Sequence, residues 1–433
     1  MSTLKVNKLR DTTGSTDAIV LDPSGGAVLA GVTTISTARI TTGITTSIQV
    51  GGGVTISESG IEASGIGITC ANINGTQIGG RRNIIINGAM NVAQRDTSST
   101  TNDSFSVDRF QNQYSGVDAG PTFAQVDVAS GTSPYTNGFR KALKITNADQ
   151  SSGAGTSDMM AIVYKFEAQD VANSGWNYTS ASSFITLSYW VKSSVAQNFY
   201  GRFQSLDGTS QNYPFETGSL TADTWTKITN TIPGNSNLQF DNDVNHGLTL
   251  ELSTFRGTDK TGSVSLNAWA AYGGGTTRTP DQTSTWYTTN GATFEITGVQ
   301  LEVGPQATPF EHRSYQQEIE LCYRYYYKLK AGTSGFWGAG VWYNSTSFIC
   351  FIAFPVVMRT NVTAVEQSGT ASHYKVIANA TTYTCNSVPT YGGDANNSSQ
   401  TVGFPFSSGP SQGQSGIARS GSADSYLAWS AEL

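Results

Sequence analysis

Aromatic residues in polar loops are the side chains of this sequence best suited to binding a ligand. A sugar stacks its apolar face on an exposed ring, while nearby amides and carboxylates bind its hydroxyl groups. We expect a glycan-binding surface built from six loop aromatics: Trp176, Tyr178, Tyr213, Tyr272, Trp286 and Tyr287.

Burial in a core is nevertheless the more common fate of any single aromatic residue. The pair Trp286–Tyr287 is the strongest candidate for exposure, because adjacent residues on a strand face opposite ways and cannot both be core. Three other tryptophans stand in alternating segments and are expected inside a core: Trp190, Trp225 and Trp269.

Catalytic groups are scarce near these aromatics. A glycosidase needs two carboxylates roughly 5–10 Å apart on either side of one sugar. Glu167 and Asp170 are the acids nearest to Trp176, and we interpret them as loop and surface charges. No nucleophile motif or phosphate loop is present, and the three histidines are isolated: His246, His312 and His373. The sequence therefore predicts no active site.

One acidic loop resembles the start of a calcium site. Asp241, Asp243 and Asn245 have the spacing of its first ligands, and we expect a structural Ca²⁺ there, with no other cofactor. His246 replaces the usual glycine and Leu252 the usual glutamate, so an Asn/Asp-rich turn explains the segment equally well.

The sequence pattern predicts that these residues are positioned by one large β-domain over residues 83–312. Short alternating segments separated by turn-rich loops predict a jelly-roll β-sandwich. The expected strands are 139–145, 161–166, 184–191, 199–203, 225–232, 248–252, 264–270 and 294–301. The last of them is expected to lie beside residues 84–86, with Gly298 as a bulge.

A helix follows this domain and links it to the next, over residues 313–331. Ser314 and Gln317 form a capping box, and Arg324 and Lys328 are expected in its last turns. An apolar stripe repeats at helical spacing: Tyr315, Ile319, Cys322 and Tyr326. The stripe either packs on the sandwich of the same chain or forms the interface of a homotrimer.

The segments at the two ends complete the expected architecture. Residues 23–82 hold short Ile/Val-rich pieces broken by glycine, which favour an intertwined β stalk over the alternative of a flexible linker. Residues 1–22 carry one short amphipathic alternation, and residues 332–433 predict a small C-terminal β-domain. The fold class is thus mainly β, with one linking helix.

Composition excludes several protein classes. Only 13% of residues are charged, the net charge is −6, and no basic block suggests a nucleic-acid partner. Neither a signal peptide nor an apolar stretch of bilayer length is evident, so we expect cytoplasmic synthesis without membrane insertion. The four cysteines are far apart and are expected to be free and mostly buried: Cys70, Cys322, Cys350 and Cys385.

Several motifs resemble a module that recurs in bacteriophage tail-fibre and related virion structural proteins. Three of these motifs lie at the end of the β-domain and in the helix that follows it: Gly298-Val-Gln-Leu-Glu-Val-Gly-Pro, Ala307-Thr-Pro-Phe-Glu-His-Arg-Ser-Tyr and Glu320-Leu-Cys-Tyr-Arg-Tyr-Tyr. Asn83-Ile-Ile-Ile-Asn-Gly-Ala-Met-Asn-Val-Ala-Gln-Arg and Val107-Asp-Arg-Phe resemble the start of that module. Met1-Ser-Thr-Leu-Lys-Val-Asn-Lys-Leu-Arg-Asp resembles fibres of phages of marine bacteria, cyanobacteria among them.

The resemblance implies a trimeric tail fibre that is part of the virion. Residues 1–22 would attach to tail tube, adaptor or capsid proteins, and the outer domains would bind host polysaccharide or lipopolysaccharide without catalysis. The jelly roll would be similar to carbohydrate-binding modules. A capsid-attached fibre or decoration protein and a polysaccharide depolymerase tailspike remain the alternatives.

Overall fold

The computed structural model describes residues 81–433 in full and, before them, only the backbone of eight short strands. These are β1 (Lys8–Arg10), β2 (Asp17–Leu21), β3 (Ala27–Leu29), β4 (Ser47–Val50), β5 (Val54–Ser57), β6 (Gly60–Ala63), β7 (Asn72–Ile73) and β8 (Thr76–Gln77). They pair as the sheets β1-β2-β3 and β4-β5-β6 and the pair β7-β8. The attachment segment expected at 1–22, the intertwined stalk expected at 23–82 and Cys70 lie for the most part outside the described residues.

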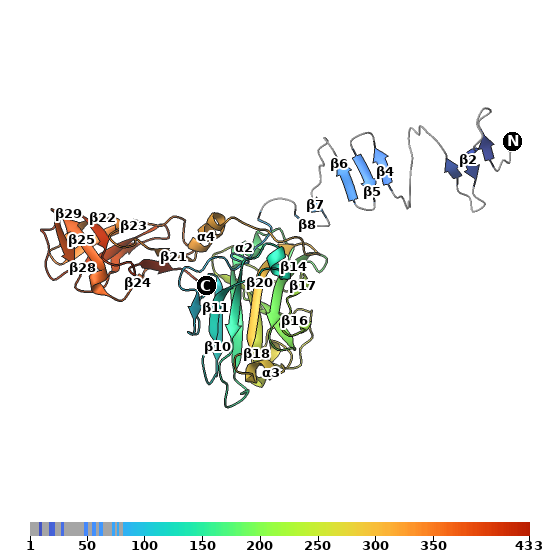
Figure 1. Ribbon diagram of the computed structural model, residues 1–433, viewed down its shortest axis with the longest axis horizontal. Coiled ribbons are helices and arrows are strands. Elements are labelled where there is room, and N and C mark those ends of the chain that lie inside the picture. Colours follow the sequence, from blue (N-terminus) through green and yellow to red (C-terminus); the bar gives the residue numbers. More distant parts are fainter. Residues whose placement is uncertain are drawn as a thin grey trace. The chain divides into compact units, whose positions relative to one another are not determined.

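Residues 98–303 fold as a β-sandwich of jelly-roll type, here called the sandwich (Figure 1). Its first sheet has the order β10 (Phe110–Ser115), β13 (Met159–Glu167), β18 (His246–Arg256), β15 (Asn198–Ser205), β16 (Gln211–Ser219), β19 (Ala270–Ala271). Its second sheet has the order β17 (Thr226–Pro233), β14 (Phe184–Ser193), β20 (Thr293–Val303), β12 (Lys141–Thr146), β11 (Thr122–Asp127), β9 (Ser98–Ser99). The loops carry α1 (Ser133–Thr136), α2 (Ala168–Ala172), α3 (Thr285–Thr288) and the 3-10 turns η1 (Thr258–Lys260) and η2 (Gly275–Thr277).

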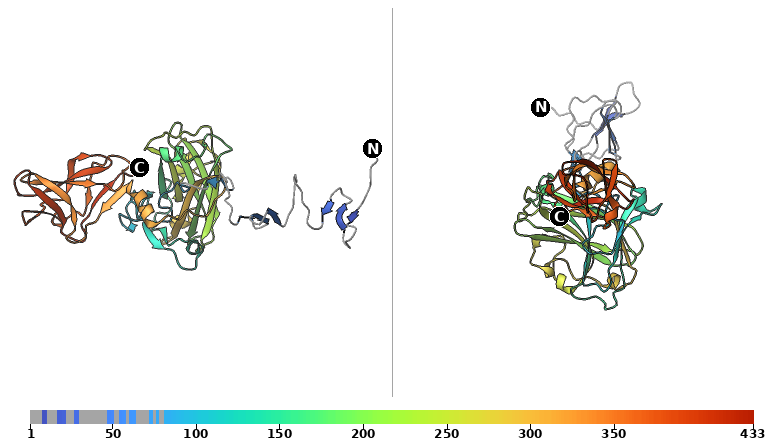
Figure 2. Two further views of the ribbon diagram at one scale, coloured as in Figure 1. Left: turned by 90° about the horizontal axis from the view of Figure 1, so that it is seen from above. Right: turned by 90° about the vertical axis from the view of Figure 1, so that its left-hand side faces the viewer.

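The two sheets lie face to face and enclose one apolar core (Figure 2). Alternation along β14 sends Ile185, Leu187 and Tyr189 into it, while Trp190 and Lys192 point to the outer face. Removing such side chains from water, at about 25 cal/mol per Å² of apolar surface, is the main force that holds the sheets together. The prediction of a mainly β fold with a jelly roll is confirmed.

Local predictions for these strands held except in one loop. Gly298 is a bulge, because Ser188 opposes Gln300 while Trp190 opposes Thr297, which leaves one extra residue in β20. The backbone N–H of Ile84 donates to Leu301 O at 2.9 Å, as expected for the closing strand. The strand expected at 264–270 is wrong, since only Ala270–Ala271 pairs with β16. Strands β10, β11 and β16 were not predicted.

The linking helix is α4 (Tyr315–Tyr323), and its capping box is present. The Ser314 Oγ accepts from the Gln317 N–H at 3.3 Å, and the Gln317 Oε1 accepts from the Ser314 N–H at 3.0 Å. The prediction that Arg324 and Lys328 end this helix is wrong. The chain leaves the helix after Tyr323, and Lys328 lies in the strand β21 (Tyr326–Leu329).

Residues 326–433, here called the C-terminal unit, contain a seven-stranded antiparallel sheet and a three-stranded one. The larger has the order β26 (Thr381–Thr384), β25 (Tyr374–Ala378), β29 (Ser415–Ser420), β22 (Phe336–Asn344), β23 (Ser347–Ala353), β28 (Ser399–Pro405), β27 (Thr390–Ala395). The smaller has the order β21, β30 (Leu427–Ser430), β24 (Glu366–Gln367), and the 3-10 turn η3 (Ala371–His373) precedes β25. A second core lies on one face of the larger sheet and includes Phe348, Cys350 and Val376.

Three cysteines of the described residues are free and buried: Cys322, Cys350 and Cys385. Burial raises the pKa of Cys350 and of Cys385 to about 12, so both stay as thiols at neutral pH. Between residues 81 and 433, no helix is long and apolar enough to cross a membrane.

Candidate functional site

Most of the aromatics predicted to bind glycan lie inside the sandwich. Four of the six are at most 3% exposed, namely Trp176, Tyr213, Trp286 and Tyr287. A buried ring offers no face to a sugar, so these four do not form a binding surface. The sequence could not separate them from exposed aromatics, because a loop that folds back over the sheet edge buries its rings as completely as a strand does.

The argument for Trp286–Tyr287 fails for a specific reason. The two residues lie in the short helix α3, where adjacent side chains need not point in opposite directions. The Trp286 indole N–H donates to Thr293 O at 2.9 Å. The Tyr287 hydroxyl donates to Asp158 Oδ2 at 3.0 Å, and its ring stacks on Phe255 with centroids 4.4 Å apart. Both side chains are parts of the core.

The other two predicted aromatics are half-buried and held by neighbours. Tyr178 lies edge-on to Phe240, with centroids 5.0 Å apart. The Tyr272 hydroxyl accepts from Arg278 Nε at 3.0 Å. Trp190, Trp225 and Trp269, which were expected in the core, are also only half-buried.

The acidic loop predicted to bind calcium forms a turn stabilised by its own side chains. The Asp243 carboxylate accepts from the Asn245 backbone N–H at 3.0 Å and from its side-chain amide at 2.5 Å. Asp241 accepts from Gln239 at 3.0 Å. Across residues 81–433 no cluster of three or more His, Cys, Asp or Glu side chains could hold a metal ion. The calcium ion stays a prediction.

The stripe predicted along the linking helix is not continuous. Tyr315 is 59% exposed, whereas Cys322 is buried against Ile86 and Val92 of the same chain. Tyr326 belongs to β21 rather than to the helix, so it cannot extend the stripe. The buried part of the helix packs within its own chain, and Tyr315 is the member of the predicted set that faces solvent.

Glu167 and Asp170, interpreted from sequence as surface charges, bond to residues just outside the sandwich. The buried Glu167 carboxylate accepts from Arg324 Nε at 2.6 Å and Nη2 at 2.7 Å, and from the Tyr325 hydroxyl at 2.6 Å. Burial alone would raise the pKa of Glu167, but these hydrogen bonds outweigh it and lower the pKa. Asp170 pairs with Arg81 at 2.9 Å. The interpretation of Glu167 as a surface charge was wrong.

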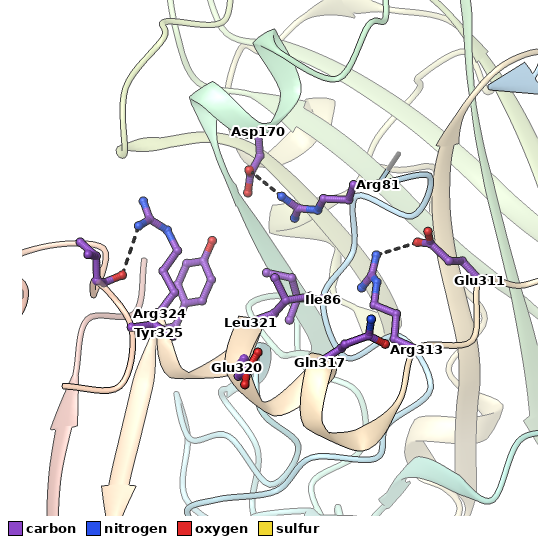
Figure 3. A pocket seen from close by; sticks show the side chains of 12 residues that line it. Arg81, Ile86, Asp170, Glu311, Arg313, Gln317, Glu320, Leu321, Arg324 and Tyr325 are labelled. Carbon is purple, nitrogen blue, oxygen red and sulfur yellow. Dashed lines mark hydrogen bonds and ion pairs between the residues drawn. The ribbon is translucent and has the colours of Figure 1, made fainter. Parts of the chain in front are cut away.

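A pocket of about 560 Å³ opens beside Asp170, Arg324 and Tyr325 (Figure 3). Its floor is apolar, with Ile86, Leu321 and Tyr325, and three arginines surround it. Each guanidinium already has a carboxylate partner: Arg81 with Asp170, Arg313 with Glu311, Arg324 with Glu167. The charges are balanced, so the pocket does not offer a preformed site for an anion.

The exposed apolar residues point to a different surface. Nine large apolar side chains of residues 81–433 are exposed, and seven of them lie between residues 336 and 417. These seven are Phe336, Val341, Tyr343, Phe351, Val357, Tyr391 and Ile417. Val357 lines the pocket just described, and the other six lie on strands of the larger sheet. Large exposed apolar groups gathered on one unit indicate a contact surface.

Two of these residues line a pocket of about 530 Å³, here called the tyrosine pocket. Tyr343 is the second-last residue of β22 and is 60% exposed, and Tyr391 is the second residue of β27 and is 37% exposed. The Tyr391 hydroxyl donates to Gly393 O at 2.7 Å, which fixes its ring. The pocket is also lined by hydroxyl, amide and carboxylate groups from Asn344, Ser347, Thr390 and Asp394.

Local chemistry places these polar groups. The Asn344 Oδ1 accepts from the backbone N–H and the hydroxyl of Thr346, both at 2.9 Å, which closes the turn between β22 and β23. The backbone N–H of Asp394 donates to Thr401 Oγ1 at 3.1 Å, where β27 departs from regular pairing with β28. Aromatic faces beside acceptors and donors are the chemistry that sugar recognition uses.

Sequence reasoning did not select the residues of this pocket. Tyr343 follows the buried Trp342 in an alternating segment, and that alternation was a usable signal, since it places Tyr343 on the opposite face. Asp394 follows two glycines in an irregular strand, and no local signal distinguishes it from an ordinary turn residue.

Comparisons with known proteins give only remote similarity. No family model and no curated protein matches the chain. The enzymatically active domain of tailspike protein 4 of bacteriophage CBA120 is 7% identical, with a TM-score of 0.27, over 51% of this chain and 21% of that one. This chain thus spans about a fifth of the length of that protein.

Two carbohydrate-binding structures are similar at the same level. The N-terminal cellulose-binding domain of the Cellulomonas fimi β-1,4-glucanase C is 9% identical, with a TM-score of 0.24, over 50% of this chain and 99% of that one. The N-terminal tandem CBM22 domain of Paenibacillus barcinonensis Xyn10C is 9% identical, with a TM-score of 0.25, over 84% of this chain and 100% of that one. At these values the similarities carry no argument about function.

Proposed function

We propose that this chain is a fibre protein of a phage virion that binds glycans of the host surface through its C-terminal unit. The observation that carries the proposal is the tyrosine pocket, on the unit that presents seven of the nine exposed large apolar side chains. The virion part rests on the resemblance of the Asn83–Arg95 and Gly298–Tyr326 motifs to fibre modules.

The mechanism is adhesion without bond making or breaking. The sugar ring lies against Tyr343 and Tyr391, and its hydroxyls bond to the Asn344 amide, the Thr390 hydroxyl and the Asp394 carboxylate. Asp394 is the one carboxylate among the pocket residues, whereas glycoside hydrolysis uses two. Binding therefore fits the pocket better than catalysis.

The chain forms a homotrimer, and its three copies of the site together bind a surface more tightly than one site does. Linked sites that engage one surface convert modest single-site affinity into avidity, which can exceed the single affinity by about 10²–10⁴. Residues 1–22 attach the trimer to tail tube, adaptor or capsid proteins, and residues 23–82 form its stalk.

Binding of the full-length chain to host polysaccharide and lipopolysaccharide tests the site. Tyr343→Ala and Tyr391→Ala are expected to weaken binding by about tenfold or more, because truncated aromatic anchors are frequent hot spots. Tyr315→Ala is the matched control, since Tyr315 is 59% exposed and Tyr343 60%, and it should leave binding unchanged. Wild-type affinity in a folded Tyr343→Ala variant would place the site elsewhere, and release of reducing ends would replace adhesion by hydrolysis.

Light scattering tests the assembly. The full chain should have about three times the 45.9 kDa mass of one copy. A variant lacking residues 1–82 should become monomeric if the stalk holds the trimer. A monomeric full-length chain would remove the fibre part of the proposal while leaving the binding part intact.

A further inference from the structure

A second pocket lies on the outer face of the second sheet of the sandwich, in a different part of the fold from the tyrosine pocket. It has a volume of about 450 Å³ and is here called the sheet pocket. Trp190 and Ser188 from β14 and Lys227 from the edge strand β17 form its sheet side. Residues 136–139 from one loop, residues 308–310 and 312 from another, and Gly298 of β20 complete it.

Two glycines with positive φ allow this pocket to form. Gly298, in the bulge of β20, has φ +64°, and a Cβ there would lie 2.6 Å from the Phe139 ring. Gly138 has φ +93°, and a Cβ there would lie 2.9 Å from the imidazole of His312. Any larger residue at either position would therefore clash with a wall of the pocket as well as strain the backbone. The pocket is built by these local choices and is not an accidental gap.

Aromatic rings line the walls of the sheet pocket. Phe139 and Phe310 meet edge to face, with centroids 4.8 Å apart. The centroid of the His312 ring lies 5.1 Å from that of Phe139 and 4.9 Å from that of Phe310. Trp190 is half-buried on the sheet beside them. Such walls suit the apolar face of a sugar ring.

The polar groups of the sheet pocket favour an anion. Its lining residues contain Lys227 and His312 but no carboxylate. On the same sheet Lys192 pairs with Glu295 at 3.0 Å and Lys141 with Asp127 at 2.6 Å. Lys227 forms no ion pair within residues 81–433, so its ammonium is available to a ligand.

One hydrogen bond fixes the orientation of the His312 ring. Asn137 O lies 3.0 Å from His312 Nε2, and since a carbonyl oxygen only accepts, Nε2 carries a proton and donates. Nδ1 then carries the lone pair, so it can accept a hydrogen bond from a ligand hydroxyl. An ammonium binds a carboxylate with charge-assisted hydrogen bonds.

We propose that the sheet pocket binds an acidic sugar residue of a polysaccharide. The carboxylate of the sugar bonds to the Lys227 ammonium, and a sugar hydroxyl donates to His312 Nδ1. The sugar ring packs against Trp190 and Phe310. The hydroxyls of Ser188 and Thr136 lie among the lining residues and bond to the sugar hydroxyls. This site goes beyond the tyrosine pocket, which contains a carboxylate of its own and suits neutral sugars.

Calorimetry on the full-length chain tests this site with oligogalacturonate and oligoglucuronate as acidic probes and oligodextran as the neutral one. Both acidic probes should bind more tightly than oligodextran. Lys227→Gln should weaken that binding by about tenfold or more, as expected when a charged hydrogen-bond partner is lost. Trp190→Ala and His312→Gln should weaken it as well. Lys192→Gln is the matched control on the same sheet face and should bind as wild type, because Lys192 already pairs with Glu295.

The outcomes separate this site from the tyrosine pocket. Tyr343→Ala should leave uronate binding unchanged, so failure of the tyrosine pocket does not affect the result. Wild-type uronate affinity in Lys227→Gln, which changes an exposed residue and should fold normally, would overturn the proposal. Equal binding of oligodextran, or no binding of either uronate, would also overturn it. Sulfated dextran in place of the uronates distinguishes a general anion site, which it would occupy, from one specific for carboxylates.

Discussion

The sandwich and the C-terminal unit use their large apolar residues in opposite ways. In the sandwich, two sheets close on each other, and rings such as Trp286 and Tyr213 are sealed between them. In the C-terminal unit, the seven-stranded sheet buries one face with Phe348 and Cys350. Its other face exposes Phe351, which is 59% accessible.

The register of the larger C-terminal sheet explains this exposure. Val341 opposes Ile349 across β22 and β23, and neither is buried, whereas the next pair along, Trp342 and Phe348, is in the core. Phe351 opposes Thr401 on the same outer face as Val341. Exposed apolar surface of this extent does not stabilise a fold, and the proposed contact role of the C-terminal unit rests on it.

The largest expected effect on stability comes from removing a buried ring rather than an exposed one. Trp286→Ala should lower the free energy of unfolding by about 3–5 kcal/mol, because it leaves a cavity in the sandwich core. Tyr343→Ala should change it by less than about 0.5 kcal/mol, since the ring faces solvent. Urea unfolding of both variants measures the contrast, and equal losses would mean that Tyr343 is a structural residue.

Buried charge is the next point of contrast. Glu251 lies between Arg202 and Arg256 in the sandwich, its Oε2 3.0 Å from Arg202 Nη2, and all three side chains are buried. None of the ion pairs among the described residues lies within 330–426. Glu251→Gln leaves two guanidinium groups uncompensated and should cost about 3 kcal/mol. Lys141→Gln, at an exposed pair, is the control and should cost less than about 1 kcal/mol.

Acid should destabilise the two regions unequally. Burial alone would raise the pKa of Glu251, but Arg202 and Arg256 outweigh it and lower the pKa from 4.5 to about 2. A lowered folded-state pKa gives stability that is present above pH 4.5 and lost as the pH falls toward 2. Hydrogen exchange between pH 5 and pH 2 should therefore show the sandwich opening before the C-terminal sheet. The reverse order would contradict the assignment of stability to this triplet.

A smaller effect tests the helix between the two regions. Ser314→Ala removes the capping box of α4 and should cost about 1 kcal/mol of stability. Ser314→Thr, which keeps the hydroxyl, should restore most of it. Thermal unfolding measures both, and an unchanged midpoint in Ser314→Ala would show that α4 is held by packing alone.

The features predicted correctly from sequence are those set by neighbouring residues. The alternation in 184–191 and 294–301, the bulge at Gly298 and the capping box at Ser314 all depend on local periodicity or local hydrogen bonds. The failures depend on contacts between distant segments. Trp286 is buried because residues far away in the sequence enclose α3, and Glu167 is buried because Arg324 and Tyr325 cover it 157 and 158 residues later.

The candidate sites were missed for a related reason. The sheet pocket joins β14, β17, β20 and two loops, which are far apart in the sequence, and no spacing in the chain connects Lys227 with His312. The exposure of Tyr343 depends on one face of its sheet remaining uncovered. Alternation predicts two faces but cannot tell which of them another element will cover.

The outer sheet of the C-terminal unit begins and ends beside one strand pair. The strands that lead into and out of residues 330–426 are β21 and β30, which pair directly, Leu329 opposite Leu427. A segment whose two ends are hydrogen-bonded neighbours can be replaced by another of different length without displacing what precedes or follows it. Recombination at this one strand pair would therefore exchange the outer sheet as one piece, together with its contact to the sandwich at Arg359 and Val244.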